Sequence, residues 1–180
     1  HRGRTVVAWS LAPDSICREH ESGAANLAAR LAAAARCAGW GYPLAFHFDP
    51  LCEFPGWRQA YGELVDALAA AVEPSRVAWI SLGSLRYPAG FAPAISGGSA
   101  NRLFLGETVR GLDAKVRYFK EVRVALYRHV ADALRSWTGG RTGIYLCMES
   151  KDVWEAVLGW RPPSTMAVAD RIIEAASRIR

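Results

Sequence analysis

The sequence predicts an α/β fold in which parallel strands are covered by outer helices. Short runs of β-branched and aromatic residues alternate with longer runs that carry apolar residues at helical spacing, a pattern typical of βα units in a parallel sheet. The 180 residues are 51% hydrophobic and 22% charged, as expected of one globular domain with its own core. No apolar run approaches the ~20 residues of a membrane span. We therefore expect a cytoplasmic protein with no membrane partner.

Strands and helices are expected in alternation along the chain. Strands are predicted where branched and aromatic residues precede a turn signal, at 5–11, 42–48, 77–82, 143–148 and, as a short piece, 103–105. Helices are predicted where apolar residues recur every three or four positions, at 24–38, 57–72, 119–137, 153–158 and 168–179. Two prolines after position 161 break the chain, so we divide it into residues 1–160 and a terminal helical tail at 161–180.

The chain starts at His1, directly before its first predicted strand and without a signal-peptide pattern. Four good strands are too few to close a barrel, so the edge at 5–11 is expected to pair with a missing N-terminal half of the same protein. The cysteines are widely scattered, without the spacing of a metal site, at Cys17, Cys37, Cys52 and Cys147. We interpret them as reduced, mostly buried thiols.

Each predicted strand has one face of large apolar residues and one face that becomes polar at its carboxyl end. Barrel enzymes place their chemistry at the carboxyl ends of parallel strands. The candidates from this pattern are Ser10, His47, Asp49, Ser81 and Glu149. Taken singly, each is more simply explained as a satisfied structural group. The convergence of several such strand ends favours a functional site.

A metal-dependent hydrolase on a barrel is an alternative interpretation. His47 and Asp49 would share one face of a strand, and both are common metal ligands. Cys52 and His129 could be further ligands, but neither has a recognisable ligand spacing, and His129 falls among apolar residues of a predicted helix. We therefore expect no metal at these residues.

Positive charge is concentrated in one stretch of the chain. The net charge is +5 overall, and residues 102–128 carry seven basic and three acidic residues, a local charge of +4. Such a patch suits a phosphate-bearing partner such as DNA. A non-catalytic nucleic-acid-binding module is therefore a third interpretation, and a solvated surface without a partner is the simplest explanation of charge alone.

Six motifs occur in a recognisable order. They are VAWSLAP at 7–13, RLAAA with GYPLAFHFDP at 30–50, GW with Y and EL at 56–64, WISLGSLRY at 79–87, GLDAKVRYF at 111–119 and YLCMES at 145–150. Together they resemble motifs of the spore photoproduct lyase-like family of radical SAM enzymes. The resemblance implies that the chain is the C-terminal part of a partial (β/α) TIM-like barrel of radical SAM type.

The resemblance also implies an activity and its cofactors. In this family, three cysteines of a CxxxCxxC loop hold a [4Fe-4S] cluster that binds S-adenosylmethionine, and the lyase itself reverses a thymine photoproduct in DNA. The cluster loop and the hydrogen-donating cysteine would both lie upstream of this chain. The expected function is therefore a lyase-like DNA repair enzyme when intact, with the fragment inactive alone and its catalytic residues unknown.

Site residues follow from the resemblance position by position. Ser10, His47 and Asp49 would bind the cofactor, whereas Ala12 replaces a family asparagine and Gly111 a family tyrosine. These departures suggest the broader lyase-like group, whose substrates differ. The residues expected to bind substrate are Arg86, Arg110, Lys115, Arg117 and Tyr118. Arg110 and Lys115 are expected in a loop before the helix at 119–137.

Overall fold

A four-stranded parallel sheet is the centre of the computed structural model, which describes residues 5–91 and 106–179. The strands lie in the order β1-β2-β3-β7, and every neighbouring pair is parallel. Their bounds are β1 Val7–Ser10, β2 Leu44–Leu51, β3 Val77–Ser84 and β7 Gly143–Leu146. The predicted α/β fold with a parallel sheet is confirmed. The strand expected at 103–105 lies outside the described residues.

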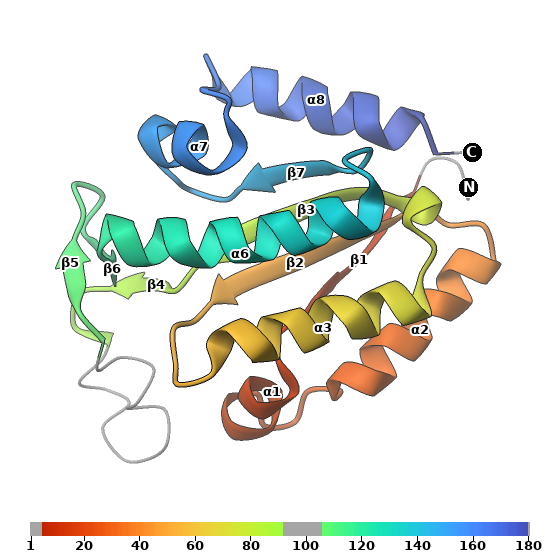
Figure 1. The fold of residues 1–180 in the computed structure, drawn as a ribbon, viewed down its shortest axis with the longest axis horizontal. Coiled ribbons are helices and arrows are strands. Elements are labelled where there is room, and N and C mark those ends of the chain that lie inside the picture. The colour runs from red at the N-terminus through yellow and green to blue at the C-terminus, as the bar shows by residue number, and fades with distance from the viewer. Residues whose placement is uncertain (1–4, 92–105, 180) are drawn as a thin grey trace.

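Helices α2, α3 and α6 cover one face of this sheet, and α7 and α8 lie beside β7 (Figure 1). The helices are α1 Asp14–His20, α2 Leu27–Gly39, α3 Trp57–Ala71, α6 Lys120–Thr138, α7 Lys151–Leu158 and α8 Thr165–Ser177, with a 3₁₀ turn at Pro74–Arg76. The seven-residue helix α1 was not predicted, because only Ile16 and Cys17 of it are buried and so little apolar periodicity marks it. Within the described residues, no helix is long and apolar enough to cross a membrane.

The core lies between the sheet and these helices. Phe46, Phe48, Ile80 and Leu82 alternate along β2 and β3 and are completely buried, as the predicted large apolar strand face requires. Each such side chain contributes about 1.5–3 kcal/mol by leaving water. The opposite helix faces are formed mainly by Tyr61, Leu64, Leu68, Leu126, Val130 and Leu134.

A small antiparallel sheet follows β3 and was not predicted. It contains β4 Arg86–Pro88, β5 Thr108–Arg110 and β6 Lys115–Tyr118 in the order β4-β6-β5. Arg110 and Lys115 are therefore on strands, and their expected placement in a loop was wrong. The hairpin between β5 and β6 closes through the Gly111 N–H, which donates to the Lys115 carbonyl at 2.8 Å. Strands of three and four residues rich in charge carry too weak an apolar pattern to be recognised.

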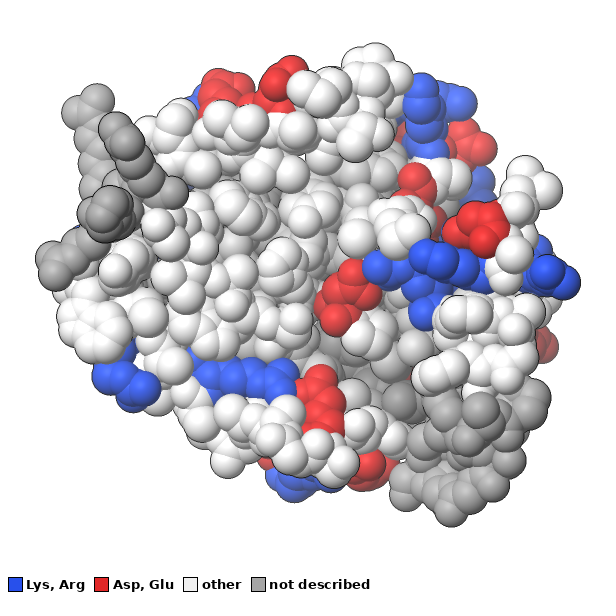
Figure 2. Space-filling model, turned by 180° about the vertical axis from the view of Figure 1, so that it is seen from behind, with Lys and Arg blue, Asp and Glu red and all other residues white. Residues whose placement is uncertain are grey.

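The second face of the large sheet is seen from behind in Figure 2. It is mainly uncharged, and both signs of charge gather on the side where the small sheet lies. This side is reached from the carboxyl ends of β2 and β3, because β4 follows β3 directly. The charged groups are therefore at the end of the sheet where barrel enzymes place their chemistry.

Candidate functional site

A row of polar side chains crosses the uncharged face at the carboxyl end of the sheet. Ser10, His47, Ser81 and Tyr145 are register partners on β1, β2, β3 and β7. Alternation along a strand directs them away from the apolar residues of the helix-covered face. Two of the predicted candidates are in direct contact, with 2.5 Å between His47 Nδ1 and Ser81 Oγ. Tyr145 was missed, although the same alternation applied to its strand identifies it.

Asp49 and Arg86 form a two-pronged ion pair beyond this row. Asp49 Oδ1 and Oδ2 accept hydrogen bonds from Arg86 Nη1 and Nη2 at 3.1 and 2.9 Å. The two side chains are 24% and 18% exposed, so water screens the pair only partly. Burial disfavours the charged guanidinium, but the hydrogen bonds and charge of Asp49 outweigh it and raise the Arg86 pKa. Arg86 therefore stays charged, and its two hydrogen bonds to Asp49 tie β2 to the start of β4.

Gly83 makes this ion pair sterically feasible. A Cβ added at Gly83 would lie 2.4 Å from the Asp49 carboxylate, much closer than any van der Waals contact. The Asp49 carboxylate thus lies against the backbone of β3 at Gly83 and from there reaches Arg86, three residues further along the chain. Glycine is the residue that allows so close an approach.

The Cys147 thiol, which sequence reasoning did not single out as a site residue, joins this group. Arg86 Nη2 lies 3.5 Å from Cys147 Sγ. Burial raises the Cys147 pKa, with the Arg86 charge opposing the shift and Asp49 adding to it. Cys52 is more strongly affected, because burial and the Asp49 charge raise its pKa to about 12. Both residues are therefore neutral thiols rather than reactive thiolates.

Glu149 is drawn away from the open face. Its Oε1 accepts hydrogen bonds from Arg123 Nε and Tyr127 Oη, both at 2.9 Å, and its side chain is only 3% exposed. The Ser84 N–H donates to the same Tyr127 hydroxyl at 2.7 Å. This network fastens the segments after β3 and β7 to α6. Arg123 is consequently a buried partner of Glu149 and does not belong to a solvated basic surface.

The small sheet brings basic side chains to the Asp49–Arg86 pair. Lys115 and Arg86 line one cavity of about 320 Å³ together with Asp49. Arg117 lies opposite Arg86 in the register of β4 and β6 and is ion-paired with Asp113. Arg110 is exposed on β5 and forms no ion pair with any described residue. Asp49, Arg86 and Lys115 are thus gathered around a common hollow.

Several of the predicted residues do not line this hollow, among them Tyr118 and Ser10. Tyr118 is 1% exposed, and its hydroxyl accepts a hydrogen bond from the Glu53 N–H at 3.2 Å, so it holds the segment after β2. Ser10 lines a different cavity of about 460 Å³, next to Arg30, whose Nη1 donates to the Ser10 carbonyl at 3.0 Å. The Ser10 side chain remains exposed there.

The geometry does not favour the metal alternative. No group of three or more His, Cys, Asp or Glu side chains able to hold a metal ion occurs in residues 5–91 and 106–179. His129 Nε2 is 2.7 Å from the Arg58 carbonyl, outside the sheet end that carries His47. The Asp49 carboxylate is already ion-paired with the Arg86 guanidinium, and this positive charge would repel a metal cation from Asp49. The described cysteines likewise do not fit an iron–sulfur cluster, which needs several thiolates in one group.

The comparisons with known proteins agree on one family. Residues 1–87 match the family model described as "Spore photoproduct lyase". The chain is 37% identical over 73 residues to spore photoproduct lyase of a Geobacillus species and 35% identical over 72 residues to that of Bacillus subtilis. These alignments cover 41% and 40% of this chain and 21% of each relative. This chain matches the spore photoproduct lyase family over part of its length.

Solved structures of spore photoproduct lyase share the fold over a longer range. A lyase complexed with dinucleoside spore photoproduct matches 81% of this chain and 45% of its own, with a TM-score of 0.69 and 24% identity. A lyase mutant with bound AdoMet and dinucleoside spore photoproduct matches 80% and 44%, with a TM-score of 0.66 and the same identity. This chain therefore spans less than half of those lyase chains.

The spore photoproduct lyase sequence match includes one part of the site and not the other. Within residues 1–87 lie Ser10, His47, Asp49, Ser81 and Arg86. The hairpin that carries Arg110 and Lys115, and the β7 strand before Cys147, lie beyond the match. Ser10, His47 and Ser81 of the polar row and the Asp49–Arg86 pair are thus the site features that lie within the family match, whereas Tyr145 lies outside it.

Proposed function

We propose that this chain forms part of a radical SAM, spore photoproduct lyase-like enzyme that repairs damaged DNA in the cytoplasm. The observation that carries this proposal is the position of the polar row and the Asp49–Arg86 pair. Ser10, His47 and Ser81 of the row and the Asp49–Arg86 pair lie on the segment that matches the family, toward the carboxyl ends of parallel strands. A missing N-terminal half of the same protein would supply the cluster and complete the sheet beyond β1.

The chain offers hydrogen-bonding groups that suit S-adenosylmethionine. This cofactor carries a carboxylate, an amine and ribose hydroxyls, so it needs polar partners beside an apolar surface. Ser10 has an exposed hydroxyl, and His47 contacts Ser81 through Nδ1, so its Nε2 can bind a ligand. Asp49, neutralised by Arg86, would shape the far end of the site. Once bound, the cofactor supplies the radical chemistry, and these residues orient it and exclude water.

The small sheet is the proposed substrate side. Arg86, Arg110 and Lys115 would contact DNA phosphates, because they are cationic and lie on β4, β5 and β6 at the open end of the site. Arg117, ion-paired with Asp113, and the buried Tyr118 would hold the hairpin in position. Phosphate contacts position the DNA without reading its sequence.

The proposal is tested with the protein at its full natural length and a dinucleoside spore photoproduct as substrate. Ser10→Ala and Asp49→Asn should each lower cofactor binding and lesion reversal by about tenfold or more, as expected when a charged or hydrogen-bonded contact is lost. Asp66→Asn, an exposed carboxylate on α3, is the matched control and should leave both unchanged. A full-length protein that binds no S-adenosylmethionine, or an Asp49→Asn variant with unaltered binding and turnover, would contradict the proposal.

A further inference from the structure

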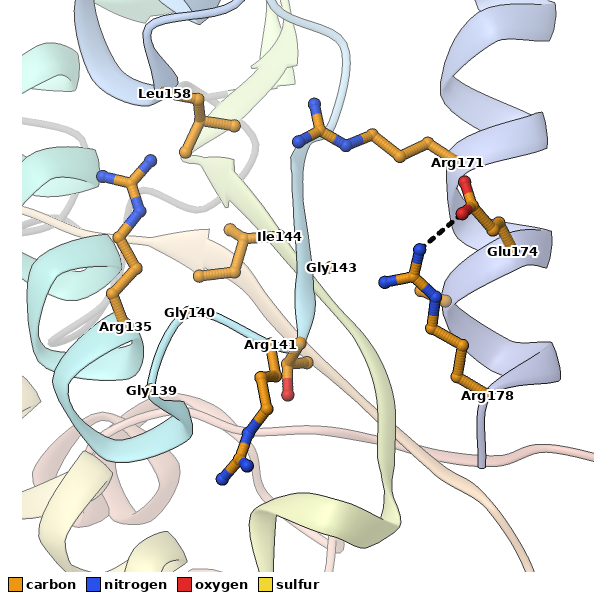
Figure 3. Close-up of a pocket in the computed structure, with 12 residues that line it drawn as sticks. Arg135, Gly139, Gly140, Arg141, Gly143, Ile144, Leu158, Arg171, Glu174 and Arg178 are labelled. Atoms are coloured by element: carbon orange, nitrogen blue, oxygen red, sulfur yellow. Dashed lines mark hydrogen bonds and ion pairs between the residues drawn. The ribbon is translucent and has the colours of Figure 1, made fainter. Parts of the chain in front are cut away.

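A second cavity, lined by basic residues, lies at the other end of β7 from the Asp49–Arg86 pair. It has a volume of about 500 Å³ and is enclosed by the end of α6, the start of β7 and α8 (Figure 3). The turn from Gly139 to Thr142 forms part of its wall. Gly143 begins β7 and Cys147, which contacts Arg86, follows its end, so the cavity and the Asp49–Arg86 pair are separated by the length of that strand, roughly 13 Å.

Cationic side chains dominate this cavity. Its charged lining residues are Arg135, Arg141, Arg171, Arg178 and Glu174. Glu174 is ion-paired with Arg178, so three guanidinium groups face the cavity without a carboxylate from its lining. The four arginines and one glutamate therefore give the cavity lining a net charge of +3.

The remaining arginines have few partners. The Arg141 backbone N–H donates to the Thr138 carbonyl at 3.3 Å, but its guanidinium forms no hydrogen bond or ion pair with any residue in the described ranges. Arg171 has its guanidinium 4.6 Å from the centre of the Trp160 ring, a contact that holds it without neutralising it. Arg135 reaches Asp132 and the Val157 carbonyl only at 3.4 Å. All three side chains can therefore turn toward a ligand without breaking a strong ion pair.

The arginines come from separate elements. In Figure 3, Arg135 extends from α6 and Arg171 from α8 toward the space beside Ile144 and Leu158, whereas Arg141 extends from the turn in the opposite direction. An adjoining hollow of about 490 Å³ shares Arg141 and Arg178 with the first. On an ordinary solvated helix, an arginine pairs with an acid one turn away, as Arg18 does with Asp14. Within the described residues, Arg141 and Arg171 have no such acidic partner and Arg135 has only the long contact to Asp132, so this group of arginines can accept an anionic ligand.

We propose that this cavity binds phosphate groups, those of a nucleotide or of a nucleic-acid strand. A concave cluster of like charges focuses positive potential and attracts an anion. Guanidinium groups match phosphate oxygens with paired, parallel hydrogen bonds. The volume is in the range of small-molecule sites. This site is independent of the polar row and of the proposed repair reaction.

The first test measures binding of inorganic pyrophosphate to the full-length protein by calorimetry at low salt. The double variant Arg141→Gln/Arg171→Gln should bind at least tenfold more weakly than the wild type, because it loses two charge-assisted contacts. Arg36→Gln, which removes an exposed arginine of α2 outside the cavity, should bind as the wild type does. Arg141→Gln alone should melt at the wild-type temperature, because the Arg141 guanidinium makes no hydrogen bond or ion pair within the described residues that the substitution could remove.

A second arm distinguishes the source of the phosphate. If the cavity holds a nucleic-acid backbone, the double variant should also lose duplex DNA affinity; if it holds a nucleotide, ADP binding should fall and duplex affinity should not. Both results support the proposal, and cofactor cleavage should be unchanged in either case, which separates it from the repair function. The proposal is overturned if the wild type binds no pyrophosphate, or if Arg36→Gln weakens binding as much as the double variant does.

Discussion

Single residues decide how the candidate site is assembled. Asp49 and Arg86 meet although 37 positions separate them, and Arg123 meets Glu149 across 26 positions. Alternation along the strands predicted that Asp49 and Glu149 belong to strand ends. It could not predict that Asp49 would pair on the open side of the sheet and that Glu149 would be buried, because partners so distant in sequence are brought together only by packing. The Glu149 turn, with Met148 at a φ of 54°, has no marker in the sequence.

Gly83→Ala should disrupt the Asp49–Arg86 pair. The added methyl group would lie 2.4 Å from the Asp49 carboxylate, so the carboxylate must move away from Arg86. We expect a loss of about 1–3 kcal/mol in the free energy of unfolding, as for other overpacked sites, measured by urea denaturation. Gly62→Ala in α3, where an added Cβ meets nothing within 4 Å, should instead be neutral or stabilising by up to about 1 kcal/mol. Equal effects of the two variants would show that Gly83 is not a steric requirement.

The Cys52 thiol should make stability fall at alkaline pH. Its pKa is raised from 9.0 to about 12, so above pH 9 the unfolded chain loses this proton while the folded chain keeps it. Fewer protons are then bound in the unfolded state, and the free energy of unfolding decreases as pH rises from 9 toward 12. Urea denaturation between pH 8 and 10.5 should show a shallower decline for Cys52→Ala than for the wild type. Parallel curves would mean that this thiol ionises in the folded protein as it does in the unfolded chain.

At the scale of elements, the apolar pattern predicted the large sheet and its helices but missed the small sheet. β2 and β3 have eight residues each with a continuous buried face, and α6 has a clear stripe of buried residues over 19 positions. β4 and β5 have three residues each. β5 pairs with β6 through a hairpin, whereas β4 pairs with β6 although the two strands are far apart in the sequence. Long elements with a buried face can be recognised from local sequence, whereas the formation of short strands such as β4 and β5 depends on tertiary contacts.

The β5–β6 hairpin is expected to provide the DNA contacts of the full-length protein. Arg110→Ala and Lys115→Ala should each reduce the slope of log affinity against log salt concentration by about one unit, because each removes one released counterion. Lys120→Ala, an exposed lysine at the start of α6, is the matched control and should leave the slope unchanged. Fluorescence anisotropy with a duplex across a salt series provides the measurement. If the Arg110→Ala/Lys115→Ala double variant kept the wild-type slope, these two side chains would be solvated and would not contact DNA.

At the scale of the whole molecule, the sheet ends in an open edge. Within the described residues, β1 pairs with β2 alone, and alternate residues of β1 are exposed. An open edge can pair with a further strand, either from the same protein or from another copy. The resemblance to solved lyase chains of which the match covers only 45% fits the first case. The same edge should control the behaviour of the 180-residue chain when it is prepared alone.

The isolated chain should self-associate through β1. The exposed backbone groups of this edge and the uncharged sheet face would pair between copies, so sedimentation velocity should show species larger than a monomer as concentration rises. Ala8→Lys places a charge on the exposed side of β1 and should shift the population toward monomer. Ala69→Lys adds the same charge to the exposed side of α3 and should not. A wild-type chain that remains monomeric with a cooperative melt would show that the four-stranded sheet is complete in itself.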